Sequence, residues 1–101
     1  MAGPIYKMFY ARPKEVWFQL SKEQQDALFE KITEAMKSVG GTSMLVCDSS
    51  WNSEKWVFWG VEEYPNMEAV QEYARSLNEL NWFRYVDSEI LLGTKMPSEP
   101  A

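Results

Sequence analysis

Histidine is absent from this 101-residue chain. Its absence excludes Ser-His-Asp and Cys-His nucleophilic schemes, general catalysis by imidazole, His-ligated haem and ordinary zinc sites. Any chemistry has to use carboxylates, Tyr, Arg, Lys, Asn or a thiol. We therefore predict a protein without a metal or another cofactor.

Cysteine and positive charge are scarce as well. The single Cys47 cannot close a disulfide within the chain, and the opening Met-Ala-Gly-Pro lacks the charged and apolar regions of a signal peptide, so we expect a cytoplasmic protein. A net charge of −5 without a Lys or Arg cluster argues against nucleic acid or an anionic membrane surface as a partner. No apolar run approaches the ~18 residues of a membrane span.

Aromatic residues, in contrast, make up 15% of the chain and are dense in the stretch Trp56-Val57-Phe58-Trp59-Gly60-Val61-Glu62-Glu63-Tyr64. Aromatic and β-branched residues followed by a proline predict a strand. Both alternating faces of this strand carry large apolar groups, so neither face can be left in water. The strand needs cover on two sides. Its glycine, amid bulky neighbours, indicates close backbone approach, a bulge or space for a ligand.

Hydrophobic periodicity predicts four strands and two helices. Strands are expected at residues 5–12, 42–50, 56–64 and 85–92, and the first alternates Ile5, Lys7, Phe9 and Ala11 with Tyr6, Met8, Tyr10 and Arg12. A capping box at Ser21 and Gln24 and an N-cap at Asn66 begin two amphipathic helices, which end at Gly40-Gly41 and near residues 78–81. The bulky segments 13–21 and 82–84 are predicted to be packed turns.

This element order predicts an α+β, ferredoxin-like βαββαβ fold, with a four-stranded antiparallel sheet and two helices on one face. We assign residues 1–95 to a single domain. Residues 96–101 contain two prolines and no periodicity, so we expect a flexible C-terminal tail.

Two helices leave the second face of the sheet bare. The large apolar residues on the strands are too many for the helices alone to cover, and an exposed aromatic sheet face marks an association or ligand site. We therefore predict a homodimer with its two sheets face to face. The residues concerned are Tyr6, Met8, Tyr10, Trp56, Phe58, Trp59, Val61 and Leu91.

The element order, size and aromatic sheet resemble the dimeric α/β-barrel superfamily, which includes muconolactone isomerases, quinone-forming monooxygenases and stress-responsive barrel proteins. Two motifs resemble the darcynin-type branch of small uncharacterised bacterial proteins: Pro13-x-x-Val16-Trp17-Phe18-x-Leu20-Ser21-x-Glu23 and Asn81-Trp82-Phe83-x-Tyr85. The resemblance implies a dimeric barrel. It also implies chemistry like that of the cofactor-free monooxygenases, in which a substrate enolate reacts with oxygen in an apolar pocket. Haem-degrading relatives hold iron through His, which this chain lacks.

Carboxylates on apolar strands are the candidate catalytic groups, because such charges must be paired, exposed or perturbed for use. If Asp48 or Asp87 faces the barrel lumen, loss of hydration would raise its pKa and suit it as a general base, with Tyr10 as a partner. The structural alternative is that Asp48 caps the hairpin and that Glu62 and Glu89 are edge or rim charges. Both readings stay open on the sequence alone.

Aromatic residues and one arginine are the candidate ligand contacts. Arg12 could clamp a carboxylate or make a surface pair, and the Trp side chains could stack on a planar substrate or fill core and interface. The predicted ligand-binding residues are Tyr6, Met8, Arg12, Trp51, Trp56, Phe58, Trp59 and Trp82. Cys47 is expected to be an inert core thiol.

Two functions follow from these features. The first is a homodimeric protein that binds a small apolar or aromatic molecule in a sheet-lined pocket, with or without cofactor-independent isomerase, lyase or monooxygenase chemistry. The second is a non-enzymatic homodimer whose aromatic face is only an interface. The two functions differ in whether a closed cavity of at least ~300 Å³ with a convergent polar group remains once the dimer has formed.

Overall fold

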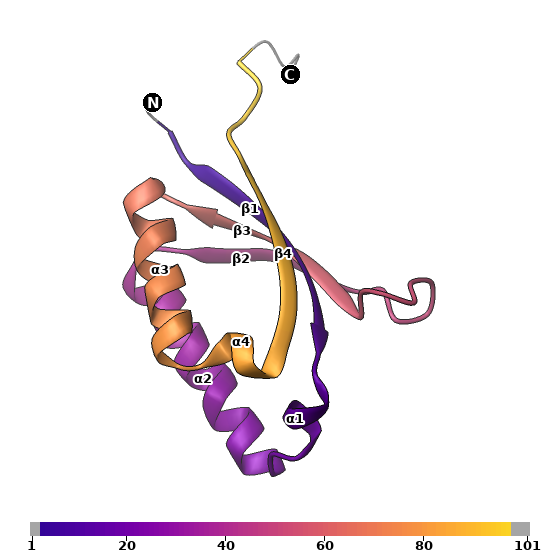
Figure 1. Cartoon of the computed structure of the whole chain (residues 1–101). Coiled ribbons are helices and arrows are strands. Elements are labelled where there is room, and N and C mark those ends of the chain that lie inside the picture. Colours follow the sequence, from indigo (N-terminus) through magenta and orange to yellow (C-terminus); the bar gives the residue numbers. More distant parts are fainter. Residues whose placement is uncertain (1–2, 98–101) are drawn as a thin grey trace.

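The computed structural model describes residues 3–97. Its helices and strands follow one another along the chain in the predicted order, with two additional helical turns (Figure 1). The elements are β1 (Ile5–Pro13), α1 (Glu15–Phe18), α2 (Lys22–Ser38), β2 (Thr42–Asp48), β3 (Phe58–Tyr64), α3 (Met67–Glu79), α4 (Trp82–Tyr85) and β4 (Val86–Gly93).

The four strands form one antiparallel sheet in the order β2-β3-β1-β4. Figure 1 shows α2 and α3 side by side on one face of this sheet. The two central strands, β1 and β3, pair from Ile5 opposite Tyr64 to Ala11 opposite Phe58. The ferredoxin-like α+β arrangement predicted from the sequence is therefore confirmed.

Local side-chain chemistry sets the beginning of both long helices, as predicted. The Ser21 hydroxyl accepts a hydrogen bond from the Gln24 amide at 3.1 Å, and the Gln24 side chain accepts one from the Ser21 amide at 2.8 Å. The Asn66 side chain accepts from the Ala69 amide at 2.8 Å. Gly40, with φ of +80°, follows the end of α2 in a conformation that favours glycine.

The two predicted packed turns are single helical turns, α1 and α4, and they meet each other. Trp17 of α1 is buried, and its ring centroid lies 6.0 Å from that of Trp82 and 6.3 Å from that of Tyr85. The Lys14 amide donates to the Tyr85 carbonyl at 2.7 Å. These contacts join the end of β1 to the beginning of β4.

Two strands are shorter than predicted, and the first of them, β2, ends at Asp48 rather than at Ser50. β3 begins at Phe58 rather than Trp56, because serines of the preceding turn take up the backbone groups of Trp56. Ser53 Oγ accepts from the Trp56 amide at 2.9 Å, and Ser49 Oγ donates to the Trp56 carbonyl at 2.9 Å. With its backbone groups engaged in the turn, Trp56 lies outside the sheet ladder.

The hydrophobic core occupies one end of the helix-covered face. Its buried members are Ile5, Ile32, Tyr64, Ala69, Val70, Tyr73 and Leu77. This cluster lies where Ile5 pairs with Tyr64, whereas the same face continues along β1 through Lys7 and Phe9 to Ala11. Core packing at one end leaves the remainder of the face to be lined by other side chains.

The opposite face of the sheet has no helix over it among the described residues, and we call it the open face. Strand pairing places Tyr6 opposite Glu63, Met8 opposite Val61 and Tyr10 opposite Trp59 on this face, with Leu45, Cys47 and Leu91 on the flanking strands. Phe58 does not belong to the open face, since it pairs with Ala11 on the helix-covered face. Within residues 3–97, none of the helices has the length and apolar character needed to cross a bilayer.

Candidate functional site

A cavity of about 320 Å³ lies between the helix-covered face of the sheet and the helices. Its lining is mostly apolar. Aromatic rings come from Phe9, Phe29, Phe58, Tyr73, Trp82 and Phe83, and aliphatic groups come from Ala11, Ile32, Met36, Val46, Ala74, Leu77 and Ile90. The polar groups on its wall are Lys7, Glu62, Thr33, Ser43 and Ser88.

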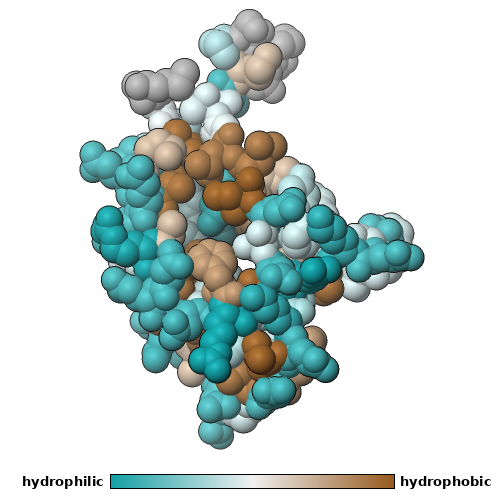
Figure 2. Space-filling view, in the orientation of Figure 1, coloured by the Kyte–Doolittle hydropathy of each residue, from teal (hydrophilic) through white to brown (hydrophobic). Residues whose placement is uncertain are grey.

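Exposed apolar residues surround the cavity mouth. Phe29, Val46, Phe83 and Ile90 line the cavity and are still 39–58% exposed. Figure 2 shows hydrophobic surface over the upper part of β4 and in the gap between β4 and the helices. An apolar opening of this kind marks a ligand-binding or association site.

Small residues make the cavity possible. Ala11 and Ala74 lie on its wall, and Gly60 allows the Phe9 ring to lie close against β3. A Cβ at Gly60 would lie 2.7 Å from the Phe9 ring and 2.6 Å from the Leu45 carbonyl oxygen. The close backbone approach predicted for this glycine is present, and it sets the position of one aromatic wall of the cavity.

A buried ion pair forms the polar end of the cavity. Lys7 of β1 pairs with Glu62 of β3 in the strand register, and Lys7 Nζ lies 3.6 Å from Glu62 Oε1. The two residues are 7% and 6% exposed. Tyr64 donates its hydroxyl to Glu62 Oε1 at 2.6 Å, and Lys7 Nζ lies 4.9 Å from the Tyr73 ring centroid. The carboxylate therefore has two partners that fix its position.

Burial changes the proton affinities of this cluster. It lowers the pKa of Lys7, and the Glu62 carboxylate opposes that change. Burial together with the Glu62 charge raises the pKa of both Tyr64 and Tyr73, so both phenols are neutral at neutral pH. The site then has one ammonium and one carboxylate, with no net charge.

This arrangement can donate a hydrogen bond to a ligand and can move a proton between two groups inside a largely apolar space. Among residues 3–97, no three Cys, Asp or Glu side chains are grouped so that they could hold a metal ion.

Two of the predicted ligand-binding residues, Phe58 and Trp82, line the cavity. The others lie elsewhere. Tyr6, Met8 and Trp59 are on the open face, and Trp51 is 80% exposed in the loop between β2 and β3. In Figure 1 this loop extends away from the body of the molecule.

Trp56 and Arg12 lie together next to the open face. The Trp56 ring centroid is 6.1 Å from that of Tyr10 and 5.9 Å from the Arg12 guanidinium carbon. Arg12 Nε lies 3.3 Å from Asp87 Oδ2, and both side chains are about half exposed. The surface-pair alternative for Arg12 matches this geometry.

The three predicted catalytic residues, Asp48, Asp87 and Tyr10, lie outside the cavity lining. Asp48 Oδ1 accepts from the Ser50 amide at 2.9 Å and from the Ser50 hydroxyl at 2.6 Å, and these hydrogen bonds lower the pKa of Asp48. Asp87 pairs with Arg12 and also lies 3.6 Å from Lys14 Nζ. Tyr10 donates its hydroxyl to the Met8 sulfur at 3.4 Å. A catalytic role for these residues stays a prediction.

Sequence reasoning missed Lys7 and placed Glu62 only among the candidate strand carboxylates. Glu62 is a buried residue on a central strand rather than a rim charge, whereas Glu89 is exposed and lies 3.7 Å from Lys55. The signal for Lys7 was its place on the stripe of Ile5, Phe9 and Ala11, where a charge needs a buried partner.

No model of a known protein family and no curated protein matches this sequence. Solved structures do match its fold. Chlorite dismutase from Candidatus Nitrospira defluvii in complex with imidazole superposes with a TM-score of 0.74 at 12% identity, over 96% of this chain and 42% of the enzyme chain. A mutant of that enzyme in complex with cyanide gives 0.73 at 12% identity, over 96% and 42% of the two chains.

A protein of unknown function from Rhodopseudomonas palustris superposes with a TM-score of 0.69 at 19% identity, over 99% of this chain and 86% of that chain. At these identities the likeness shows the fold alone, which is ferredoxin-like α+β. This chain spans less than half the length of the chlorite dismutases that it matches.

Proposed function

We propose that this chain binds a small, neutral, largely apolar molecule with one hydrogen-bond acceptor in the cavity between the sheet and the helices. The observation that carries the proposal is the buried Lys7–Glu62 pair on the wall of an apolar cavity of about 320 Å³. Ligand sites combine these features, a mostly apolar pocket of about 300–1,000 Å³ with a few convergent polar groups.

Charge balance favours a neutral ligand. An anion near Lys7 would also meet the Glu62 carboxylate, and a cation near Glu62 would meet the ammonium, since the two atoms are 3.6 Å apart. A carbonyl or ether oxygen can accept a hydrogen bond from Lys7 without disturbing the pair. The aromatic rings of Phe58 and Trp82 favour a ligand with a flat apolar body.

The ion pair itself argues for a functional site. A buried charged pair is rarely more stabilising than apolar residues of the same volume, because both ions lose their hydration. Here the pair lies beside a cavity that apolar side chains could fill. We infer that the two charges stand at this position because they recognise a polar group of the ligand.

Acetophenone, a neutral aromatic ketone, is a suitable probe for this cavity. Titration should shift the methyl NMR signals of Ile32, Leu77 and Ile90, which line the cavity, in a saturable way. The methyl signals of Leu45 and Leu91 on the open face should stay unchanged.

The variant Ala74→Leu adds bulk to the cavity wall and should weaken acetophenone binding by at least about tenfold, the effect of roughly 1.4 kcal/mol. Ala27→Leu is the matched control, because it makes the same change on an exposed part of α2 outside the cavity lining. Shifts confined to Leu45 and Leu91, or equal effects of the two variants, would exclude the cavity as the binding site.

An enzymatic role, whether isomerase, lyase or monooxygenase without a cofactor, is part of this proposal only if a base reaches the bound molecule. The Glu62 carboxylate on the cavity wall can accept a proton, and Lys7 can do so after it has passed its own proton to Glu62. Membership in the darcynin-type branch and a cytoplasmic location stay predictions.

A second candidate function is a homodimer formed through the open face. Leu91 and Leu45 on the two edge strands are 64% and 49% exposed on this face, on either side of the aromatic residues of β1 and β3. A second copy with the same face would cover these groups by sheet-on-sheet packing.

Sedimentation at micromolar concentration should show a dimer that Leu91→Lys converts to monomer, because the charge would be buried in the interface. Phe18→Lys is the control, since Phe18 is 69% exposed on α1, away from the open face. A monomeric wild-type protein, or a dimer that both variants dissociate equally, would refute an interface at the open face.

A further inference from the structure

We propose that Lys7 captures small apolar aldehydes covalently, by forming an imine through its ε-amine inside the cavity. The inference rests on the proposed function, since the aldehyde has to enter the same cavity as a non-covalent ligand.

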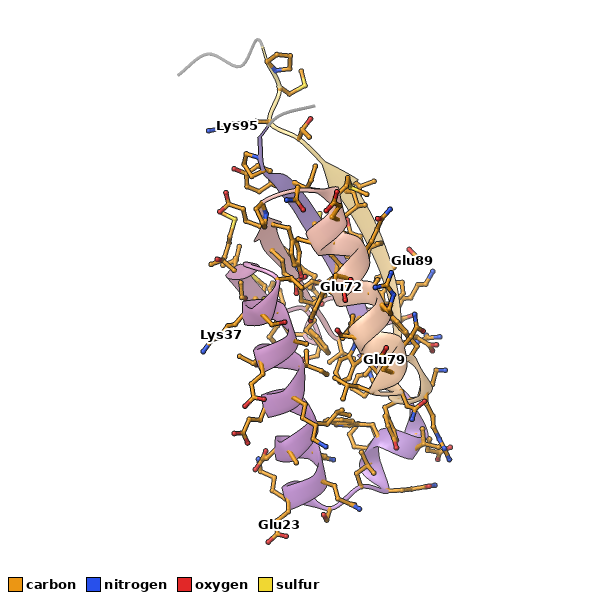
Figure 3. The ribbon with its side chains drawn as sticks, turned by 90° about the vertical axis from the view of Figure 1, so that its left-hand side faces the viewer. Glu23, Lys37, Glu72, Glu79, Glu89 and Lys95 are labelled. Carbon is orange, nitrogen blue, oxygen red and sulfur yellow. The ribbon has the colours of Figure 1, made fainter. Side chains whose placement is uncertain are left out.

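Lys7 differs from every other lysine of the chain in its surroundings. It is 7% exposed and is the lysine among the residues that line the cavity. The lysines at positions 22, 31, 37, 55 and 95 are exposed, and Lys14 has a side chain 39% exposed. Figure 3 shows Lys37 and Lys95 pointing outward into solvent.

The arrangement around Lys7 Nζ suits a nucleophilic amine. Glu62 Oε1 lies 3.6 Å away and can accept a proton from the ammonium, which leaves a neutral amine and a neutral carboxylic acid. Tyr64 holds that carboxyl oxygen through a hydrogen bond of 2.6 Å. Burial also lowers the pKa of Lys7, which increases the fraction of neutral amine near neutral pH.

The reaction balances without an oxidant or a reductant. The neutral amine attacks the carbonyl carbon, a C–N bond forms, and a proton moves from nitrogen to the former carbonyl oxygen to give a carbinolamine. The Glu62 carboxylic acid then protonates the hydroxyl group, water leaves with the carbonyl oxygen, and a protonated imine remains beside the Glu62 carboxylate. The net charge of the site is zero before and after the reaction.

The cavity restricts the aldehydes that can react. Its apolar lining and volume of about 320 Å³ favour a compact aromatic or aliphatic aldehyde over a charged or heavily hydroxylated one. A neutral aldehyde also keeps the charge balance of the Lys7–Glu62 pair. Benzaldehyde is therefore the probe of choice.

The test is reductive trapping. The full-length protein is incubated with benzaldehyde and cyanoborohydride, which reduces an imine to a stable benzylamine, and the modified lysines are found by peptide mass mapping. Lys7 should be labelled at least about tenfold faster than any exposed lysine, because the cavity holds the aldehyde beside its amine. An excess of acetophenone should slow labelling at Lys7 and leave the other lysines unchanged.

Three variants distinguish imine formation inside the cavity from labelling of a lysine that is merely accessible. Lys7→Arg keeps the positive charge and should abolish the label at position 7. Ala74→Leu keeps Lys7 and should slow its labelling, whereas Ala27→Leu should not; circular dichroism checks that each variant is folded. This second pair keeps the test valid if Lys7→Arg does not fold.

The outcomes distinguish this inference from the proposed function. If acetophenone shifts the cavity methyl signals but benzaldehyde labels only exposed lysines, the cavity binds ligands and the imine proposal is wrong. If neither the methyl signals nor Lys7 respond, both proposals are wrong. Labelling at Lys7 that Ala74→Leu and Ala27→Leu slow equally would show that the aldehyde does not enter through the cavity, which overturns the inference.

Discussion

Replacing Glu62 with glutamine should lower the free energy of unfolding by about 3–5 kcal/mol near pH 7, the usual cost of leaving a buried charge unpaired. Glutamine keeps the shape of the side chain, and its carbonyl oxygen can still accept the Tyr64 hydroxyl at the position where Oε1 now lies. In the wild type, the negative charge of Glu62 opposes the lowering of the Lys7 pKa by burial, and the variant removes this charge. The expected loss therefore reports the electrostatic partner of Lys7 rather than a cavity or a lost hydrogen bond.

The loss of stability in Glu62→Gln should also depend on pH. In Glu62→Gln the folded-state pKa of Lys7 falls further below its ordinary value of 10.5, so the unfolded chain binds more protons than the folded one between those two values. Stability of the variant should rise with pH in that window, by up to about 1.4 kcal/mol per pH unit. The deficit relative to wild type should therefore shrink towards pH ~10.

Urea unfolding at several pH values measures both effects. Glu89→Gln is the matched control, since Glu89 is exposed and its pair with Lys55, at 3.7 Å, should contribute about 0–1 kcal/mol. The double variant Lys7→Met with Glu62→Gln should recover most of the loss, because no buried charge remains. A Glu62→Gln variant as mild as Glu89→Gln, or one whose deficit is independent of pH, would contradict the assignment of a charged Lys7.

The elements of this fold were predictable because their signals are local. The capping residues Ser21 and Asn66 bond to amides three residues further along the chain, and Gly40 ends a helix through its own backbone conformation. Alternation along residues 5–12 gave the two faces of β1 correctly. Such features depend on residues that are close together in the sequence, so the sequence alone is enough to predict them.

The cavity depends on residues that meet only in the folded chain. Both faces of the stretch 56–64 are apolar, so its pattern does not say which face the helices cover, and Phe58 turned out to face them. Lys7 and Glu62 come together through the register of β1 with β3, which no local motif specifies. The single chain has a cavity of about 320 Å³ with a polar pair on its helix-covered face, whereas the criterion predicted from the sequence concerns a closed cavity that remains once a dimer has formed.

The carboxylates singled out from the sequence show the same limit. Asp48 and Asp87 stand on strands with apolar neighbours, and desolvation could have raised their pKa values. In the fold Asp48 bonds to Ser50, two residues away, and Asp87 meets Arg12 across the β1–β4 pairing. Nearby partners outside the cavity satisfy these charges, whereas Glu62 depends on a partner across the central pair of strands.

Raising the pH above about 10 should destabilise the protein through Tyr64 and Tyr73. Burial and the Glu62 charge raise the pKa of both phenols above their ordinary value of 10.0. Above pH ~10 the unfolded chain therefore loses phenolic protons that the folded chain retains, and the free energy of unfolding falls with pH. Each tyrosine contributes a slope of about 1.4 kcal/mol per pH unit, so the two together give a slope of roughly 3 kcal/mol per pH unit.

Lys7 changes the free energy of unfolding in the opposite direction, but only over a limited pH range. Its folded pKa is lowered, so its contribution to stability increases with pH and is complete once the pH passes the unfolded value of 10.5. Above pH ~10.5 the two tyrosines act without this compensation, and the fall in stability should be steepest there. Urea unfolding can be followed by circular dichroism between pH ~9 and ~12, which gives the slope of the free energy of unfolding against pH. Tyrosinate absorbance of the same samples measures the ionisation of the tyrosines.

Tyr64→Phe separates the two phenols. The variant should be less stable near pH 7 by about 1.5–3 kcal/mol, because Glu62 loses a hydrogen bond to its charged oxygen. Its slope above pH ~10.5 should nevertheless be about half that of wild type, since only Tyr73 still resists ionisation. Tyr6→Phe, on the open face, should leave the slope unchanged. If Tyr64→Phe unfolds with the wild-type slope, Tyr64 does not hold its proton against alkaline pH, and the cluster around Glu62 is more hydrated than its burial indicates.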